Sequence, residues 1–349
     1  METDTELVWK SAVDLTAMMK TGQVSASEVL DAHLDHIAEV NPKVNAIVTI
    51  AAEHGRNMAA EADRRQAAGE ELGLLHGLPI AHKDLANTAG IRTTHGSPLM
   101  ADHVPTKNDL IVERAVDAGA VTMGKTNTPE FGAGSQTFNA VFGETVNPYD
   151  TTRTCGGSSG GAAVALATGM VPIADGSDMG GSLRNPASFC NVVGLRPSPG
   201  RVPAWPKANP WSYLSTEGPM ARSVDDCALL LAAQAGPDAR NPIALETPGI
   251  FFAPPIAEPT STLRVAWAPD LGGLPVHPDV TAALAHVPQV FDGLGHCVED
   301  ACPDLTEAGY VFDTLRAWSF ATSYSGLIEK FGDKMKETVR WNVRRGMEM

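Results

Sequence analysis

The stretch TCGGSSGGAAVALATGMVPIADGSDMGGSLR, residues 154–184, decides how this chain is organised. It holds two glycine-framed serine sites, GGSSGG at residues 156–161 and GGS at residues 180–182, separated by an apolar segment that can cross the protein interior. Glycine allows backbone dihedral angles that other residues avoid and lets the backbone come close to a ligand. We therefore expect serine hydroxyls and backbone N–H groups from the two sites to converge on one place.

Length, charge and cysteine content bound the kind of protein this is. The chain has 349 residues, enough for one large α/β domain or two smaller ones. Its formal net charge is −15 and it has no basic run, which argues against nucleic acid or an anionic membrane surface as the main partner. The acidic N-terminal segment is unlike a secretory signal, and no segment has the character of a transmembrane helix. Five cysteines without CxxC spacing predict free thiols in the cytoplasm and no zinc site.

Hydrophobic periodicity predicts strands that alternate with helices, which is typical of an α/β sheet. Within residues 11–40 we expect two helices, the first capped by Ser11 and ended by Gly22, the second opened by a capping box at residues 25–28. Further helices are expected at residues 52–69, 110–118, 162–168, 223–235, 278–293 (interrupted at Pro288), 304–330 and 338–349, strands at 46–50, 78–84, 120–124, 171–174, 192–195 and 263–268, and irregular chain at 197–219 and 236–262.

Three chemistries compete for the glycine-framed serines. The nucleophile elbow of α/β-hydrolases, G-x-S-x-G, is matched at Ser158 and at Ser159, but the elbow follows a strand and precedes an acid and a histidine. Residues 147–154 are typical of a loop, and nothing marks any of the downstream histidines as a base. A phosphate-binding loop would end in Gly-Lys-Ser/Thr and follow a clear strand, and both features are missing.

The third chemistry is a Ser–Ser–Lys arrangement, in which Ser182 attacks, Ser158 relays the proton and Lys83 accepts it. A serine hydroxyl is a weak nucleophile until a base takes its proton, and lysine is a base only when it is neutral. Desolvation at the end of the apolar strand 78–84 lowers the pKa of a lysine toward the working range. The glycines before Ser182 free backbone N–H groups to form an oxyanion hole. Singly, a strand-end lysine is more often a solvated charge and a serine in a glycine loop a turn former.

Taken together, GGSSGG at residues 156–161, GSDMGGSLRNPA at residues 176–187 and GLPIAHKD at residues 77–84 resemble the amidase signature family. The similarity extends from the N-terminal helices to about residue 235, and the 24-residue step from Ser158 to Ser182 is the family's spacing. The resemblance implies an α/β fold with a large mixed β-sheet covered by helices on both faces. It also implies an amidase that hydrolyses a carboxylic amide to an acid and an amine or ammonia.

The resemblance further implies a role for each residue of the site. Ser182 would be the acyl-forming nucleophile, Ser158 the bridging serine after a cis peptide bond, and Lys83 the base. The remaining residues that it places at the site are the oxyanion-hole donors Met179, Gly180 and Gly181, which act with the N–H of Ser182, the supporting Ser159, and the loop-bracing Asp178 and Arg184. Met179 stands where the family usually has Thr, which keeps the backbone N–H and loses a side-chain hydrogen bond.

The resemblance leaves the substrate and the extent of the chain as expectations. Residues 182–186 and 200–203 are most similar to the branch with the 6-aminohexanoate cyclic dimer hydrolases, which hints at linear or cyclic unactivated amides. Family members usually continue for a hundred or more residues, so we expect one amidase domain, residues 1–349, truncated at its C-terminus. Its parts are an N-terminal helical region at 1–70, a signature core at 71–235 and a partial C-terminal region at 236–349.

Other interpretations stay open within this resemblance. One is a glutaminase like the A component of the glutaminyl amidotransferases, a second is a cyclic-amide (lactam) hydrolase, and a third is a catalytically inactive binding protein. For the leading interpretation we expect a small-molecule amide as partner, no nucleic acid, no membrane, no metal and no cofactor. A homodimer is the oligomer that we allow for.

Overall fold

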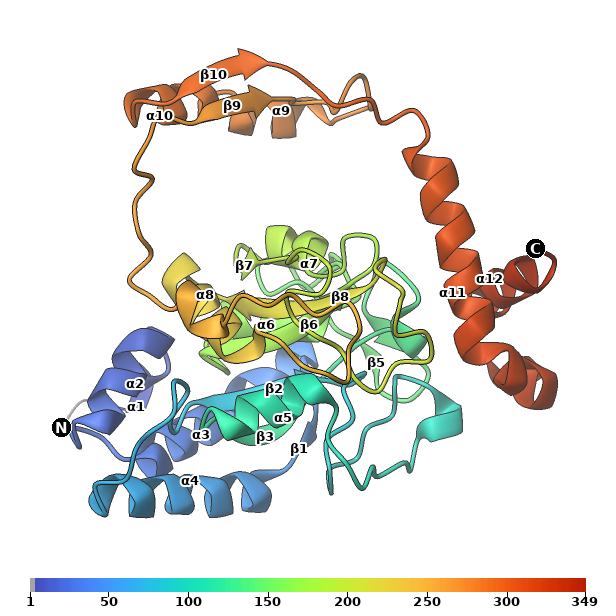
Figure 1. Ribbon diagram of the computed structural model, residues 1–349. Helices are drawn as coiled ribbons and strands as arrows, with labels where there is room; N and C mark the ends of the chain where they lie inside the picture. Colours follow the sequence, from blue (N-terminus) through green and yellow to red (C-terminus); the bar gives the residue numbers. More distant parts are fainter. Residues whose placement is uncertain (1–3) are drawn as a thin grey trace. The chain divides into compact units, whose positions relative to one another are not determined.

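A six-stranded mixed sheet organises the larger of the two units into which the chain divides (Figure 1). The structure, a computed structural model, describes residues 4–349; the larger unit comprises Met1–Ile256 and Ala317–Met349, and the smaller comprises Ala257–Arg316. In sheet order the strands are β1 (Ile47–Ile50), β3 (Val121–Thr126), β2 (Pro79–Lys83), β6 (Ile173–Asp178), β8 (Thr216–Ala221) and β7 (Val193–Gly194). Strands β3, β2 and β6 run parallel, and the other pairings are antiparallel.

Helices cover both faces of this sheet, so the expected mixed α/β architecture is confirmed. Helix α6 (Gly160–Ala167) packs against the central strands on one face, and α8 (Val224–Gln234), with α5 (Leu110–Asp117) beside it, covers the other. Every residue of β2 and of β3 is buried as a result. Parallel strands that are covered on both faces are built from nearly continuous apolar residues, which is why the polar residues at their ends stand out in the sequence.

Three of the four N-terminal helices were predicted from local signals, and the four-residue first one was not. The four are α1 (Asp4–Leu7), α2 (Ala12–Lys20), α3 (Ala26–Val44) and α4 (Ala52–Ala67). Ser11 caps α2 as predicted. The predicted capping box of α3 is confirmed, because Ser25 Oγ accepts from the Glu28 N–H at 3.0 Å and Glu28 Oε2 accepts from the Ser25 N–H at 2.8 Å.

Strand pairing corrects several boundaries in the centre of the chain. Strand β6 begins two residues later than expected and continues to Asp178, and α6 begins two residues earlier, at Gly160. The expectation of irregular chain over 197–219 is wrong from Thr216 onward, where β8 begins. Gly218 and Pro219 have little intrinsic preference for a strand, but pairing with β6 and β7 on either side overrides that preference.

Some short elements were not predicted at all. They are the hairpin β4 (Phe138–Asn139) and β5 (Gly143–Glu144), helix α7 (Arg184–Phe189), and the 3₁₀ turns η1 (Pro98–Met100), η2 (Glu130–Gly132), η3 (Gly249–Phe252) and η4 (Gly332–Lys334). Elements of two to six residues contain too little of a helical or strand period to be recognised from sequence.

The smaller unit contains a two-stranded parallel sheet, β9 (Arg264–Trp267) and β10 (Cys297–Asp300), with α9 (Pro278–Leu284) and α10 (Val287–Gly293) between the strands. The predicted break of the helical segment 278–293 is confirmed. The helix ends before Pro288, and this proline then occupies the first turn of α10, where the missing N–H costs nothing. Strand β10 was not predicted.

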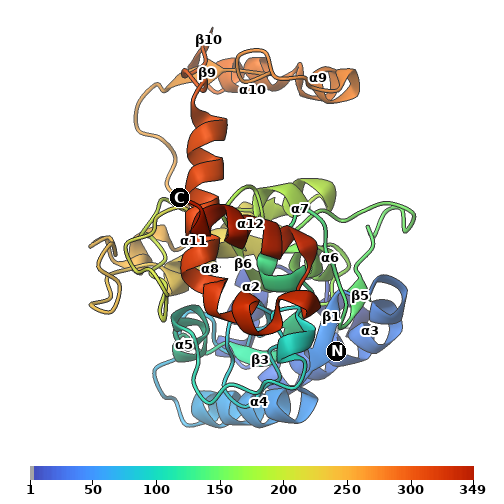
Figure 2. The same cartoon turned by 90° about the vertical axis from the view of Figure 1, so that its right-hand side faces the viewer.

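The C-terminal part of the larger unit consists of α11 (Ala308–Phe331) from Ala317 onward and α12 (Glu337–Met347). Helix α12 lies across α11, so closely that a Cβ at Gly346 would stand 2.1 Å from the Ala317 carbonyl oxygen (Figure 2). An apolar cluster joins both helices to the loop after β3, and its buried members are Phe131, Ala133, Phe320, Met335, Val339 and Val343. Among the described residues no helix has both the length and the apolarity needed to cross a bilayer.

Ser25→Ala tests the contribution of the capping box to the larger unit. The substitution leaves the Glu28 N–H at the first turn of α3 without its partner, so we expect a loss of about 1 kcal/mol of unfolding free energy. Urea unfolding followed by circular dichroism measures the change. Ser135→Ala is the control, because Ser135 is exposed and outside any helix cap. Equal stability of the two variants would contradict the prediction.

Candidate active site

Lys83 ends β2 and carries the amine around which the predicted site residues gather. Its side chain is buried, and Nζ lies 2.7 Å from Ser158 Oγ, 2.9 Å from Ser159 Oγ and 3.1 Å from Ser177 Oγ. Desolvation lowers the pKa of Lys83 to about 7, against the opposing charges of nearby carboxylates. Three hydroxyls around a desolvated amine form a chain along which a proton can move.

A buried aspartate on the neighbouring strand fixes the backbone of Lys83. Asp175 Oδ1 accepts the Lys83 N–H at 2.8 Å, and Oδ2 is hydrogen-bonded to His82 Nδ1. His82 Nε2 in turn lies 3.1 Å from Thr122 Oγ1 on β3. Burial raises the pKa of Asp175, but His82 and the other donors outweigh it and the net shift is downward. Sequence reasoning missed Asp175, whose contact with residue 83 depends on the order of strands in the sheet.

The loop before α6 presents Ser158 and Ser159 toward Lys83. The peptide bond between Gly157 and Ser158 is cis, as the resemblance implies. Thr137 supports the loop from outside: its Oγ1 donates to the Gly156 carbonyl at 2.8 Å and accepts the Gly160 N–H at 3.1 Å. A Cβ at Gly160 would lie 2.2 Å from Thr137 Oγ1, so close packing requires glycine at residue 160.

Ser182 follows β6 and is joined to the first serine site through the backbone. The Ser159 N–H donates to the Ser182 carbonyl oxygen at 3.2 Å. Ser182 is half-buried, and within residues 4–349 its hydroxyl forms no hydrogen bond. The structure therefore places Ser182 next to the loop of Ser158 and Ser159, with its side chain unengaged.

Asp178 holds the loop that carries Ser182. Its carboxylate accepts the Gly181 N–H at 2.8 Å, the Leu183 N–H at 3.1 Å and two Arg184 donors at 3.0 Å each. Burial works to raise the pKa of Asp178, but Arg184 and the two backbone donors outweigh it and lower the pKa to about 2. Among the predicted oxyanion-hole residues, Gly181 therefore has its N–H committed to the Asp178 carboxylate.

Arg196 is a second brace that sequence reasoning missed. Its guanidinium donates to the Asp178 backbone carbonyl, to Asp178 Oδ1 at 3.2 Å and to the Leu214 carbonyl at 3.0 Å. It therefore ties the end of β6 to the segment before β8. Arg196 follows the two-residue strand β7 in a proline-rich segment, where no local motif indicates that a residue contributes to the site.

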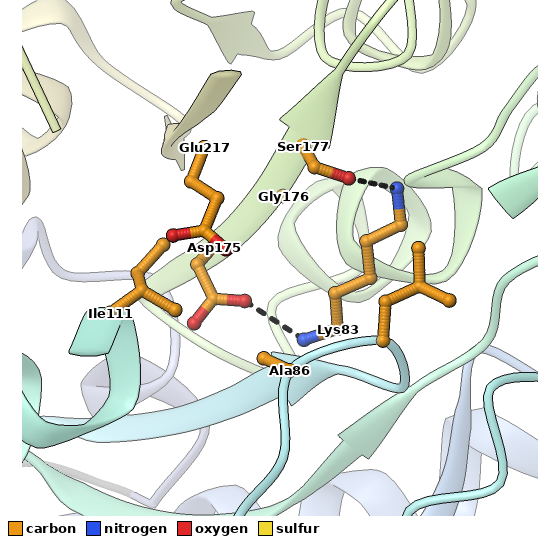
Figure 3. A pocket seen from close by; sticks show the side chains of 8 residues that line it. Lys83, Ala86, Ile111, Asp175, Gly176, Ser177 and Glu217 are labelled. Carbon is orange, nitrogen blue, oxygen red and sulfur yellow. Dashed lines mark hydrogen bonds between the residues drawn. The ribbon is translucent and has the colours of Figure 1, made fainter. Parts of the chain in front are cut away.

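A cavity of about 40 Å³ lies on one side of Lys83 (Figure 3). The residues that line it are Lys83, Leu85, Ala86, Ile111, Asp175, Gly176, Ser177 and Glu217. Ser177 and Glu217 were not among the predicted site residues, although Ser177 directly contacts the lysine amine. Within residues 4–349 no three His, Cys, Asp or Glu side chains are gathered so that they could hold a metal ion.

Comparison with known proteins places these residues in a family context. The family model described as Amidase matches residues 28–348. The chain is 40% identical over 301 residues to an acylamidase from Rhodococcus erythropolis, which covers 86% of the chain and 63% of that relative. It is 39% identical over 310 residues to the A component of a glutamyl-tRNA(Gln) amidotransferase from Thermobifida fusca, which covers 87% of the chain and 61% of that relative. The chain thus spans less than two thirds of the length of these relatives.

Solved structures agree on the fold. A bacterial aryl acylamidase of the amidase signature enzymes superposes with a TM-score of 0.90 at 29% identity, over 98% of this chain and 73% of the other. A 6-aminohexanoate cyclic dimer hydrolase complexed with substrate superposes with a TM-score of 0.88 at 30% identity, over 98% and 72%. The mixed sheet of the larger unit is therefore the fold that the sequence resemblance implied.

Gly176→Ala tests the close packing between β6 and the serine loop. A Cβ at residue 176 would lie 2.6 Å from Ser159 Oγ and 2.7 Å from Leu183 Cδ2, so one of them must move. We expect a loss of about 1–3 kcal/mol, measured as a lower melting temperature. Gly326→Ala is the matched control, since residue 326 lies in α11 with open space around it and alanine favours a helix. A Gly176→Ala variant as stable as this control would refute the packing argument.

Proposed function

Since the chain belongs to the amidase signature family, we propose that it hydrolyses a carboxylic amide to an acid and an amine or ammonia, through an acyl-enzyme on Ser182. The observation that carries this proposal is the desolvated Lys83 amine at 2.7 Å from Ser158 Oγ, beside the loop of Ser182. Solvated surface lysines keep their proton at neutral pH, whereas this amine is suited to take one.

The protonation state of Lys83 gives the direction of proton flow. A neutral amine has two N–H donors and one lone pair, so among its three hydroxyl neighbours at least one must donate to it. Ser158 is the nearest of the three and stands on the loop that contacts Ser182. In the proposed acylation, Ser182 Oγ bonds to the substrate carbonyl carbon as its proton passes to Ser158 Oγ. The proton of Ser158 passes to Lys83 Nζ.

The same route returns the proton to the leaving group. As the carbon–nitrogen bond breaks, the amine takes a proton from Ser158, which recovers one from Lys83. Water then attacks the Ser182 ester and gives up a proton through Ser158 to Lys83. As the ester bond breaks, Ser182 Oγ takes that proton back by the same route, and the acid product leaves. Each half-reaction ends with Lys83 neutral, as it began.

Oxyanion stabilisation is assigned to the loop between β6 and α7. We place the N–H groups of Met179, Gly180 and Ser182 around the developing oxyanion, while the Gly181 N–H stays on Asp178. Asp178, held by Arg184 and Arg196, would keep these donors in position before the substrate arrives. Preorganised donors need no reorientation during the reaction, which is the source of their contribution to the rate.

Proteins that are similar to this chain support a class of substrate. An acylamidase, an aryl acylamidase and a cyclic dimer hydrolase are all similar to this chain, which supports a carboxylic amide as the substrate. The similarity to the A components of amidotransferases supports a second candidate, a glutaminase that passes ammonia to a partner. Glutamine hydrolysis that appears only with companion proteins would favour this second candidate over a free amidase.

A fluorophosphonate probe tests the nucleophile without knowledge of the substrate. We expect covalent label on Ser182, found by mass spectrometry of the digested protein, and no label in Ser182→Ala. Ser135→Ala, which removes an exposed serine, should label as the parent does. Label on Ser158 or Ser159 with none on Ser182 would contradict the assignment. Hydrolysis of a panel of linear, aryl and cyclic amides, abolished by Ser182→Ala, then identifies the substrate class.

The pH dependence of labelling tests the base. With the pKa of Lys83 lowered to about 7, the lysine is protonated below that pH and free above it, so the labelling rate should rise through pH 7. Lys83→Ala should lower the rate on the order of 10²-fold or more and remove this rise. Lys107→Ala, at an exposed position, is the control. A rise that survives in Lys83→Ala would show that another group is the base.

A further inference from the structure

The apolar cluster that joins α11 and α12 to the loop after β3 reaches the candidate active site at two points. The first is the turn η2, where a Cβ at Gly132 would lie 3.7 Å from Ser158 Oγ and the neighbouring Phe131 belongs to the cluster. The second is Met179, whose side chain packs against the cluster from the loop before Ser182. The cluster therefore borders both the bridging serine and the loop to which we assign the oxyanion donors.

Tyr324 on α11 adds an aromatic ring to this border. The ring packs against Phe131 with centroids 4.7 Å apart and against Phe320 with centroids 5.6 Å apart. Burial raises the pKa of the Tyr324 phenol to about 12, so the side chain is uncharged near neutral pH. Phe131 and Phe320 are buried, whereas Tyr324 keeps part of its surface exposed. The residues that are only partly buried against the cluster are Leu99, Met179, Tyr324, Leu327 and Ile328.

The carboxylate beside the cluster is committed to protein groups. Glu130 is buried; its Oε1 accepts from the Ser97 hydroxyl at 2.6 Å and its Oε2 accepts from the Lys336 N–H at 2.6 Å. With both oxygens engaged, Glu130 is not available to the ammonium group of an amino acid such as glutamine. What the cluster offers to a substrate is therefore mainly apolar surface.

We propose that Tyr324 is a specificity-determining residue: together with Met179 and Phe131 it binds an apolar, aromatic substituent of the amide substrate. Such a substituent leaves water when it packs against these side chains, which is the source of the preference. This inference rests on the proposed function, which it deepens by naming the kind of amide, and it favours a free amidase over a glutaminase.

The substituent has two places on the substrate from which it can reach the cluster. Ser158 returns the proton to the leaving amine, so Phe131 and Gly132 next to it border the amine side. Met179 stands on the loop that holds the oxyanion, which belongs to the acyl side. The experiment therefore varies the two sides separately.

Three amides compared with acetamide test the inference. Phenylacetamide adds an aromatic ring on the acyl side, acetanilide adds one on the amine side, and glutamine carries charged groups instead. The parent chain should hydrolyse phenylacetamide or acetanilide with a higher kcat/KM than acetamide or glutamine. In Tyr324→Ala we expect the preference for the ring over acetamide to fall about tenfold. Tyr324→Phe, which retains the ring, and Trp318→Ala, which removes an exposed ring elsewhere on α11, should keep the preference.

Binding without turnover keeps the test decisive. In Ser182→Ala, broadening of the ¹⁹F signal of ring-fluorinated phenylacetamide or acetanilide measures binding, and adding Tyr324→Ala should weaken it about tenfold. Tyr324→Leu keeps an apolar side chain against Phe131 and should lower the preference as well if the alanine variant folds poorly. A parent chain that shows no preference for a ring, or a preference and binding unchanged in both variants, would overturn the inference and leave amide hydrolysis intact. Ring binding that depends on Tyr324 in a chain that hydrolyses no amide and takes up no fluorophosphonate would retain the binding site and reject the proposed function.

Discussion

Burial of one lysine amine is the constraint on which the rest of this structure depends. Moving the pKa of Lys83 from 10.5 to about 7 costs the folded protein about 5 kcal/mol below pH 7, because in the unfolded chain the same ammonium is fully solvated. Only a large, well-packed core can carry such a cost, since net stabilities of folded domains are themselves about 5–15 kcal/mol. The all-buried strands β2 and β3, covered by helices on both faces, supply that core.

The glycines of the stretch 154–184 allow the serine loop to pack against the sheet closely enough to reach the buried Lys83 amine. Ser159 must approach β6 closely enough for its hydroxyl to reach Lys83, and at Gly176 a side chain would collide with it. At Gly160 a side chain would collide with Thr137, and at Gly161 with the Asn127 backbone, 2.2 Å from the position of a Cβ. The glycines therefore do more than allow unusual dihedral angles, because they set how close the serine loop comes to the sheet.

Patterns within a few residues predicted most of the helices and strands. The site residues that sequence reasoning missed owe their contacts to the pairing of strands that are distant in the sequence. The capping box at Ser25, the position of Lys83 at the end of an apolar strand and the helix after the glycine loop all follow from signals within a few residues. Asp175, Ser177, Arg196 and Glu217 carry no such signal. Their contacts exist because β6 lies between β2 and β8, an order that no single segment encodes, and Glu217 lies in a segment whose composition predicted irregular chain.

Two carboxylates near Lys83, Asp178 and Asp175, fix the geometry of the site and also act on the charge of the lysine. Asp178 is committed to two arginines and the loop backbone, and Asp175 to His82 and the Lys83 N–H, so each fixes geometry with a charge that stays constant. Both charges also favour the ammonium form of Lys83, yet desolvation outweighs them and the net effect is a lysine that is neutral near pH 7. A stronger desolvation alone would give a free amine too weakly basic to take a proton from serine, and stronger charges alone would leave it permanently protonated. The balance between desolvation and fixed charge therefore leaves a fraction of Lys83 unprotonated near pH 7, with an amine that is still basic enough to accept a proton from serine.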